Sequence, residues 1–506
     1  MDLLADAPHV SISTLHADLD GRLAALRDDA TAVAQSRTHV DAALSSDTAH
    51  YGINTGFGAL AQQQIPPEQV EALQRNLLLS HAVGVGDLVP KPVTRLMLQL
   101  KIHALGLGYS GVSPRTFEQL LQLAKHDLVP AVPSRGSVGA SGDLAPLAHL
   151  ALPLIGHGAF WTADGTDTHP AADVLQVHGL DPITLQAKDG LALINGTQLM
   201  GAYAAHILHA AHRLLRWADL VAAMSLEALQ GSIKPFDERV HAVRPHPGGQ
   251  TVATNVRMLL QESEILESHR TCGKVQDPYC LRCVPAVHGA SRDALRYATT
   301  VTERDINSVT DNPLVFDNGD IVSGGNFHGQ PLALALDTAA IALAELASIS
   351  ERRTYLLLKG HDGLPKLLME DTGLNSGFMI PQYTAAALVS ENKSLCHPAS
   401  VDSIPTSLGQ EDHVSMGSIG AVQALQVLAN VEEVIAIELL TAAQALDFRR
   451  PLRPGRGVER AHERIRAAIP HRTADAAFDA DLDRCRQFVR SPALLDTIGN
   501  ALAPIQ

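Results

Sequence analysis

Aromatic and basic residues are scarce in this 506-residue chain. Phe, Trp and Tyr make up 4% of the residues although 46% are hydrophobic, so small and aliphatic side chains supply most of the apolar surface. Such a composition favours helices that pack closely. The 39 Lys and Arg residues are outnumbered by 54 Asp and Glu residues, which gives a net charge of −15. This balance argues against a nucleic-acid or anionic-membrane partner, because both attract basic surfaces.

Cysteine is also rare, and the sequence shows no secretory leader. Residues 1–6 lack the basic start and apolar core of a signal peptide. We therefore expect a cytoplasmic protein with reduced thiols. Cys280 and Cys283 form a C-x-x-C pair, but a zinc site needs a second pair, so no metal site is predicted. The uncharged window 144–163 is long enough to span a bilayer, yet its prolines and glycines indicate a buried helix that breaks into a loop.

Long helices dominate the chain beyond residue 200. Apolar residues recur at helical spacing over residues 197–230, 330–358 and 413–448. A helix of about 35 residues is ~50 Å long, and such helices usually pack in a bundle or across subunits. We expect a mainly α protein, with an N-terminal domain over 1–200 and a central long-helix domain over 201–506 that ends in peripheral helices.

The most informative segment is residues 136–146, Gly-Ser-Val-Gly-Ala-Ser-Gly-Asp-Leu-Ala-Pro. The Gly142 nitrogen can attack the Ala140 carbonyl, because glycine permits a compressed turn. Ser141 can then lose its hydroxyl as water, which leaves a methylidene group on the new ring. The product is an electrophile made from backbone. A Gly- and Ser-rich run is more often an ordinary loop, so Ala-Ser-Gly alone is a weak signal.

Three companion motifs lie in the first 200 residues. Tyr51 precedes a glycine-punctuated loop over 52–58, where a phenol acting as a base would need a lowered pKa. His81 follows an apolar helix and is itself followed by glycine, which suggests that it faces a cavity. Asn195 stands at a predicted helix N-cap, a place that also stabilises negative charge. Packing, capping and ordinary turns are the alternative explanations.

Three more motifs lie beyond residue 270. Gln276, Tyr279 and Arg282 are spaced three apart, so in a helical turn they would share one face. Arg282 can hold a carboxylate through two parallel hydrogen bonds, or it forms a structural salt bridge. Phe327 lies among glycines before a predicted helix, and Glu411 lies at the predicted start of the last long helix.

Taken together and in this order, these motifs resemble the aromatic amino acid ammonia-lyases, and specifically the histidine ammonia-lyase family. The resemblance extends from about Tyr51 to about Phe448. It implies a fumarase/aspartase-like fold whose long central helices form a bundle in a homotetramer. It also implies that Ala140, Ser141 and Gly142 mature autocatalytically into a 4-methylidene-imidazole-5-one group, so that no external cofactor is needed.

The resemblance further implies a role for each motif residue. The substrate would be a small molecule, L-histidine, and the products trans-urocanate and ammonia. The implied roles are Asp143 beside the prosthetic group, Tyr51 as the base that removes the β-proton, Arg282 on the substrate carboxylate, Asn195, Gln276 and Tyr279 as supports for the electrophile and the substrate, Phe327 as the residue that orients the ring, and His81 and Glu411 facing the imidazole.

Substrate choice rests mainly on Glu411. A glutamate can pair with an imidazole, whereas opposite a phenyl ring it would lose hydration without compensation. Tyrosine and phenylalanine ammonia-lyases and the aminomutases share the same prosthetic group, so they are the alternatives.

Overall fold

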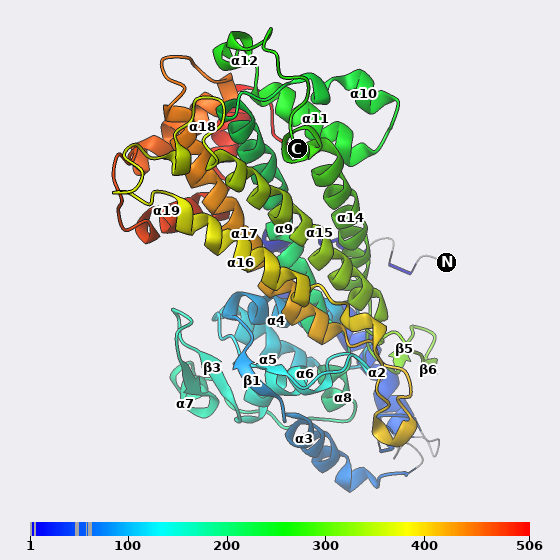
Figure 1. The fold of residues 1–506 in the computed structure, drawn as a ribbon. Coiled ribbons are helices and arrows are strands. Elements are labelled where there is room, and N and C mark those ends of the chain that lie inside the picture. The colour runs from blue at the N-terminus through cyan, green and yellow to red at the C-terminus, as the bar shows by residue number, and fades with distance from the viewer. Residues whose placement is uncertain (1–2, 5–6, 46–49, 57, 59–62) are drawn as a thin grey trace. The chain divides into compact units, whose positions relative to one another are not determined.

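The computed structural model of the protein describes residues 3–4, 7–45, 50–56, 58 and 63–506, and helices account for most of them (Figure 1). The strands pair into two-stranded antiparallel sheets, β1–β2, β3–β4 and β5–β6. The predicted mainly α class is therefore confirmed. The chain forms two compact units, one made of Met1–His206, Ala298–Asp337 and Pro398–Val422, the other of Ile207–Tyr297, Thr338–His397 and Gln423–Gln506. The predicted domain boundary at residue 200 remains a prediction.

The first unit combines short helices with the small sheets. Its helices are α1 (Leu15–Asp28), α2 (Thr31–Leu44), α3 (Val70–His81), α4 (Lys91–Leu105), α5 (Pro114–Lys125), α6 (Leu144–Ala151), α7 (Ala171–Val177) and α8 (Asp189–Ile194), with 3-10 turns at Pro67–Gln69, Leu152–Ile155, Ala399–Val401 and Ser407–Gly409. Its strands are β1 (Val85–Leu88), β2 (Pro133–Arg135), β3 (Ala159–Trp161), β4 (Thr168–Pro170), β5 (Leu314–Val315) and β6 (Ile321–Val322).

Three helices of this unit, α3, α6 and α8, contact one another. Every residue of α8 is buried, and Leu77 and Leu78 of α3 and Leu147 of α6 are buried as well. Burial of these aliphatic side chains provides the hydrophobic stabilisation of the trio. The packing fixes the end of α3, the start of α6 and the end of α8 relative to one another.

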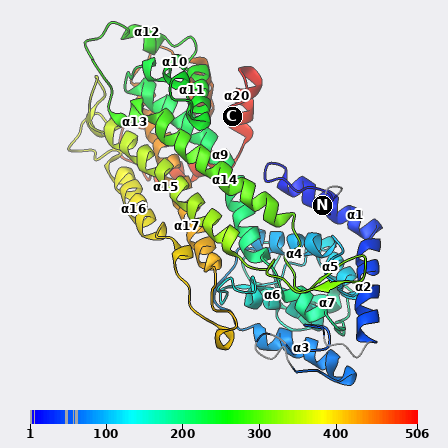
Figure 2. The ribbon, with the colours of Figure 1, turned by 90° about the vertical axis from the view of Figure 1, so that its right-hand side faces the viewer.

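The second unit is a bundle of long helices with shorter helices around it. The four longest helices of the chain are α9 (Gln198–Ala228), α14 (Val284–Ile306), α15 (Gln330–Leu357) and α17 (Gly417–Asp447). In this unit they run beside α16 (Met379–Leu395), as Figures 1 and 2 show. The shorter elements are α10 (Glu238–Ala242), α11 (Pro247–Leu259), α12 (Glu264–Ser268), α13 (Tyr279–Arg282), α18 (Arg456–Ala468), α19 (Asp479–Arg490) and α20 (Ala493–Ala501), with 3-10 turns at Lys234–Phe236 and Lys366–Leu368.

The three predicted long helices are all present. α9 and α15 match the predicted ranges to within two residues at either end. α17, however, begins at Gly417, so the prediction that Glu411 opens this helix is wrong. α14 was not among the predicted long helices, because residues such as Arg292, Arg296 and Glu303 interrupt its apolar pattern.

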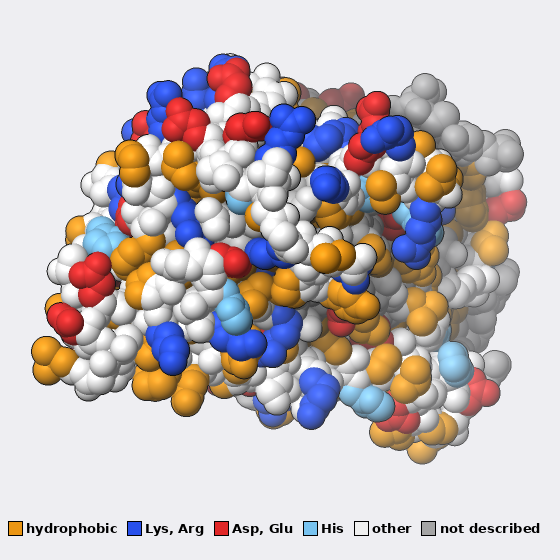
Figure 3. Space-filling model, turned by 45° about the horizontal axis from the view of Figure 1, so that its top comes forward, with side chains coloured by type: hydrophobic (Ala, Val, Ile, Leu, Met, Phe, Trp, Pro, Cys, Tyr) orange, Lys and Arg blue, Asp and Glu red, His pale blue; other side chains and the backbone are white. Residues whose placement is uncertain are grey.

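The apolar segments behave as core helices do. The window 144–163 is helical over α6, continues as a 3-10 turn and then breaks at Gly156, whose backbone is left-handed, as predicted. α15 is long and apolar enough to cross a membrane, but 67% of its most apolar window is buried within the protein, as in the core helix of a soluble protein. The face shown in Figure 3 mixes basic, acidic and hydrophobic side chains.

Candidate active site

The Ala140–Gly142 turn lies between β2 and α6, and it is packed against the connection between α8 and α9. Gly142 pairs with Gly196 and has a left-handed backbone with φ of 74°. A Cβ atom at this position would fall well inside contact distance of the Gly196 carbonyl oxygen. Only glycine therefore fits here, and glycine also permits the tight turn that cyclisation requires.

Asp143 ties this turn to the first turn of α9. Its carboxylate accepts hydrogen bonds from the Met200 N–H at 3.0 Å and from Ser137 Oγ at 3.1 Å, and its own N–H donates to the Gly196 oxygen at 2.7 Å. Burial raises the pKa of Asp143 to about 7, against the lowering effect of these hydrogen bonds. The residue thus anchors the turn next to a helix N-terminus.

Glu411 contacts the central serine of the turn directly. Ser141 Oγ donates to Glu411 Oε1 at 2.7 Å, and Thr406 Oγ1 donates to Glu411 Oε2 at 2.6 Å. Thr406 and Glu411 also pair through their backbones, which places Glu411 in a loop six residues before α17. The loop geometry, rather than a helix dipole, orients this carboxylate.

A cavity of about 290 Å³ opens over the turn in the first unit. His81, the last residue of α3, lies in its wall, and Ser80 Oγ is 3.0 Å from His81 Nδ1. Burial lowers the pKa of His81, although the Leu77 carbonyl and the Glu411 charge oppose this effect. The lowered pKa favours the neutral form of the imidazole. The wall also includes Ala140, Ser141, Gly142, Thr406 and Glu411.

Asn195 lies directly after α8, and the prediction that it caps the following helix is wrong. α8 ends at Ile194 and α9 begins at Gln198, with Thr197 immediately before it. The Asn195 Nδ2 donates to the Asn312 oxygen at 3.1 Å, whereas its Oδ1 is buried with no partner among the described residues. An orphaned buried acceptor is costly, so this oxygen is available to a group beside the turn.

Tyr51 is half-buried, and the Gly58 N–H donates to its Oη at 3.2 Å. Burial raises the pKa of Tyr51, the charges of Glu411 and Asp311 raise it further, and the hydrogen bond from Gly58 lowers it. The Tyr51 pKa is therefore raised, whereas a phenol that acts as a base near neutral pH requires a lowered pKa. Phe57, in the same predicted loop, lies outside the described residues.

The remaining predicted site residues fall in different places. Phe327 lies in a turn just before α15, within the first unit. Gln276, Tyr279 and Arg282 belong to the second unit. α13 begins at Tyr279, so Gln276 precedes it and the predicted shared helical face is wrong for that residue. Of the predicted site residues, the first-unit cavity unites His81, Ala140, Ser141, Gly142 and Glu411 in its wall, and Phe327 is not part of that lining.

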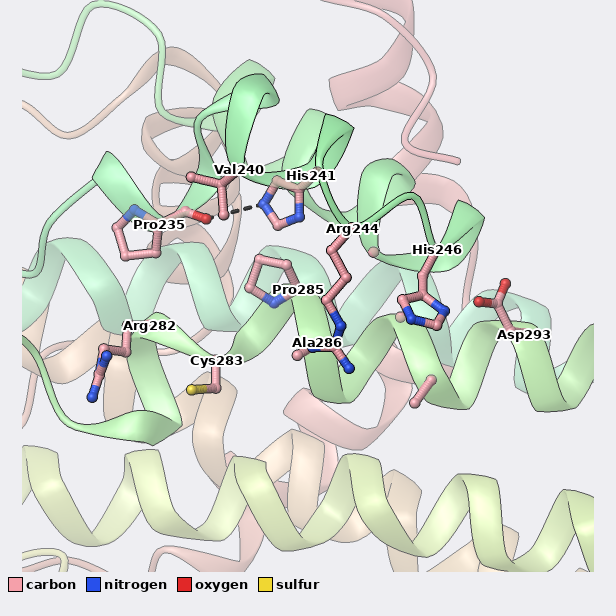
Figure 4. A pocket seen from close by; sticks show the side chains of 13 residues that line it. Pro235, Val240, His241, Arg244, His246, Arg282, Cys283, Pro285, Ala286 and Asp293 are labelled. Atoms are coloured by element: carbon pink, nitrogen blue, oxygen red, sulfur yellow. Dashed lines mark hydrogen bonds between the residues drawn. The ribbon is translucent and has the colours of Figure 1, made fainter.

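Arg282 is one of the residues that line a cavity of about 410 Å³ in the second unit, together with Arg244, His241 and Asp293, and its guanidinium points away from His241 and Arg244 (Figure 4). Its guanidinium carbon lies 4.5 Å from the centroid of the Tyr279 ring, a cation–π arrangement. The Arg282 Nε–H is buried and has no acceptor among the described residues. The guanidinium is therefore available for an anionic group.

Comparison with known proteins identifies the family. A family model described as aromatic amino acid lyase matches residues 12–467. The chain belongs to the aromatic amino acid lyase family. It is 54% identical over 466 residues to a histidine ammonia-lyase from Anaeromyxobacter sp. (strain K), which covers 90% of this chain and 92% of that protein.

Solved structures of aromatic lyases and aminomutases share the fold. The histidine ammonia-lyase from Trypanosoma cruzi superposes with a TM-score of 0.87 at 42% identity, over 94% of this chain and 89% of that one. The tyrosine aminomutase from Streptomyces globisporus gives a TM-score of 0.88 at 34% identity, over 94% of both chains. This aromatic amino acid lyase is an ammonia-lyase, that is, a carbon–nitrogen lyase.

Two contacts of the lyase site were not predicted from the sequence. Ser137 donates to Asp143 and accepts from the Gly139 N–H at 3.1 Å, so it ties together both ends of the turn. Thr406 holds Glu411 from a loop that carries no motif. Ser137 lies inside the eleven-residue segment and could have been found there, whereas Thr406 has no comparable signal.

Proposed function

We propose that this lyase eliminates ammonia from L-histidine to give trans-urocanate. The observation that supports it best is the contact between Glu411 and Ser141 at the cavity wall. It places a carboxylate, able to pair with an imidazole, directly beside the segment that would become the electrophile. The relative from Anaeromyxobacter, more than half identical in sequence, is named a histidine ammonia-lyase.

We propose further that Ala140, Ser141 and Gly142 mature into 4-methylidene-imidazole-5-one. The surroundings fit this group, because Gly142 has no room for a side chain and the buried Asn195 Oδ1 has no hydrogen-bond partner within the part of the chain that the structure describes. When formed, the group supplies an electrophile for the substrate, which makes the amino group a better leaving group. Asp143 and Asn195 would hold the prosthetic group in place.

The predicted site residues would then bind and orient the substrate. Glu411 and His81 would pair with the imidazole, and Phe327 would orient the ring. Arg282, supported by Tyr279 and Gln276, would hold the carboxylate through its two parallel N–H groups. Holding the substrate in one orientation supplies a large part of the rate acceleration.

Tyr51 Oη would accept the β-proton. Burial is the main cause of the raised Tyr51 pKa in the free protein, and the charge of Glu411 raises it further. A bound cationic imidazole would neutralise that charge and so lower the pKa of the phenol. Substrate binding would thereby make Tyr51 a better base at the moment when it is needed.

We also propose a cytoplasmic homotetramer with each site shared between subunits. Large apolar side chains are exposed along α14, α15 and α16 in the second unit, as a helical interface requires. These are Tyr297, Ile341, Tyr355, Ile380 and Tyr383.

The test is turnover without additives. Purified protein and L-histidine, with no cofactor added, should gain the absorbance of urocanate. Ser141→Ala should abolish turnover with an unchanged circular dichroism spectrum, whereas Ser268→Ala in α12 should leave it intact. Absence of urocanate with the parent protein, or turnover by Ser141→Ala, would overturn the proposal. Higher kcat/KM for L-tyrosine or L-phenylalanine would indicate the alternative activities.

A further inference from the structure

Lys101 is a buried lysine in the middle of α4, a helix whose other residues there are mostly apolar. Its side chain is 2% exposed, and it belongs to the same unit as the Ala140–Gly142 turn. A buried amine is costly unless it is hydrogen-bonded, so its partners indicate what it does. None of the roles assigned above uses it.

The amine of Lys101 is bonded to the connection between α8 and α9. Nζ donates to the backbone oxygen of Asn195 at 2.6 Å and lies 3.4 Å from Gln198 Oε1. Burial lowers the pKa of Lys101 to about 7, while the carboxylates of Asp311 and Asp143 raise it and Lys188 lowers it. Whether charged or neutral, the amine keeps N–H donors for the Asn195 oxygen.

The next carbonyl of this connection, that of Gly196, is bonded to the residue that follows the Ala140–Gly142 turn. The Gly196 oxygen accepts the Asp143 N–H at 2.7 Å, and Gly196 pairs with Gly142. Two consecutive carbonyls therefore link Lys101 to the Ala140–Gly142 turn. Because Gly142 has no spare room against Gly196, a small shift of the connection would relax the turn.

Other contacts hold the side chains and the N–H groups of the connection, such as the Thr197 N–H, which donates to Thr310 Oγ1 at 3.4 Å, but not the Asn195 carbonyl. The Asn195 Nδ2 donates to the Asn312 oxygen, and Thr197 Oγ1 donates to Asp305 Oδ1 at 2.6 Å. Without the Lys101 amine, the buried Asn195 oxygen would lose its hydrogen bond, and the peptide would be free to rotate towards another donor.

We propose that Lys101 is a positioning residue for prosthetic-group formation: it pins the Asn195–Gly196 peptide, which in turn holds the turn compressed for cyclisation. This inference rests on the proposed function. In the step, the Gly142 nitrogen bonds to the Ala140 carbonyl carbon and its proton passes to the carbonyl oxygen. That oxygen leaves as water with the Ser141 amide proton. The Ser141 hydroxyl then leaves as a second water with the Ser141 α-proton, which forms the methylidene group.

The test compares three variants of the full-length protein by intact mass, thermal melting and turnover. Lys101→Met removes the N–H donors and keeps a side chain of similar length. We expect folded protein in which most chains have not cyclised and therefore still carry the mass of both waters. Lys101→Arg keeps a donor and should restore the loss of two waters. His103→Leu, a buried position on the same helix, should mature like the parent.

Each outcome decides whether Lys101 positions the turn for maturation or only stabilises the fold. A purely structural role would lower the melting temperature of Lys101→Met but leave the folded chains fully matured, and that result would overturn the inference. So would equal loss of maturation in His103→Leu. If the parent protein itself retains both waters, the proposed function fails, whereas full maturation of Lys101→Met beside a matured parent defeats only the inference about Lys101.

Discussion

Glu411→Gln tests the proposed choice of histidine with little change of shape. In the protein, one carboxylate oxygen accepts from Ser141 and the other from Thr406. Maturation removes the Ser141 hydroxyl, so the contact that remains in the matured protein is the one with Thr406, and a glutamine amide can keep it by donating from its nitrogen to the Thr406 hydroxyl. The substitution therefore removes the negative charge and leaves the cavity wall in place.

The expected loss follows from one charge-assisted hydrogen bond to the imidazole. Such a bond contributes about 1.5–3 kcal/mol, which corresponds to a fall of about 10- to 150-fold in kcat/KM for L-histidine. The activity towards L-phenylalanine should not fall, because a phenyl ring gains nothing from the carboxylate and loses its hydration.

The assay is the initial rate of urocanate formation over a range of L-histidine concentrations, with both variants shown to be fully matured by mass. Thr406→Val is the matched control, since it removes a contact to Glu411 and keeps the charge. This variant should lower kcat/KM for L-histidine about fivefold, which corresponds to the loss of one hydrogen bond of ~1 kcal/mol. If kcat/KM of Glu411→Gln stays within about twofold of the parent, well below the range above, the reasoning on selectivity is refuted.

Three further predictions concern the turn and the second unit. Gly142→Ala should block maturation, seen by mass as retention of both waters, because an added Cβ would meet Gly196 and the backbone is left-handed. Burial raises the pKa of Glu227 to about 8. The stability that its protonated form contributes is full below pH ~4.5 and is lost as pH rises through ~8, so the free energy of unfolding should fall over this window in the parent but not in Glu227→Gln, as urea unfolding at several pH values would show. Glu438→Gln should leave the buried guanidinium of Arg353 without its counter-charge, a distance of 2.7 Å in the parent, and lower stability by about 3–5 kcal/mol; an unchanged melting temperature would contradict this.

Helical periodicity was sufficient to predict the long helices but not where each begins. Val414 and Met416 continue the apolar pattern of α17, so the sequence predicts a helix from residue 413. In the structure the Met416 N–H donates to the Val138 oxygen at 2.9 Å and Met416 has a left-handed backbone with φ of 55°. A contact with a segment far away in the chain therefore overrides the local pattern.

The sequence predicted which residues belong to the site but not which hydrogen bonds join them. Ser141 and Glu411 were both predicted from their motifs, yet their direct hydrogen bond joins positions 270 residues apart. Asn195 was assigned to an N-cap on its residue type, whereas burial and the packing of α8 decide its place. Lys101 was not predicted as a site residue, because its contact with the Asn195 oxygen joins segments far apart in the chain and follows only from the fold.

The central claim is that the electrophile is made from the chain itself. The most direct measurement is the intact mass of the purified full-length protein, with the peptide that contains residues 136–146 located by digestion. The account predicts a mass lower than that of the sequence by two waters, both missing from this peptide. An active protein that retains both waters in this peptide would contradict it.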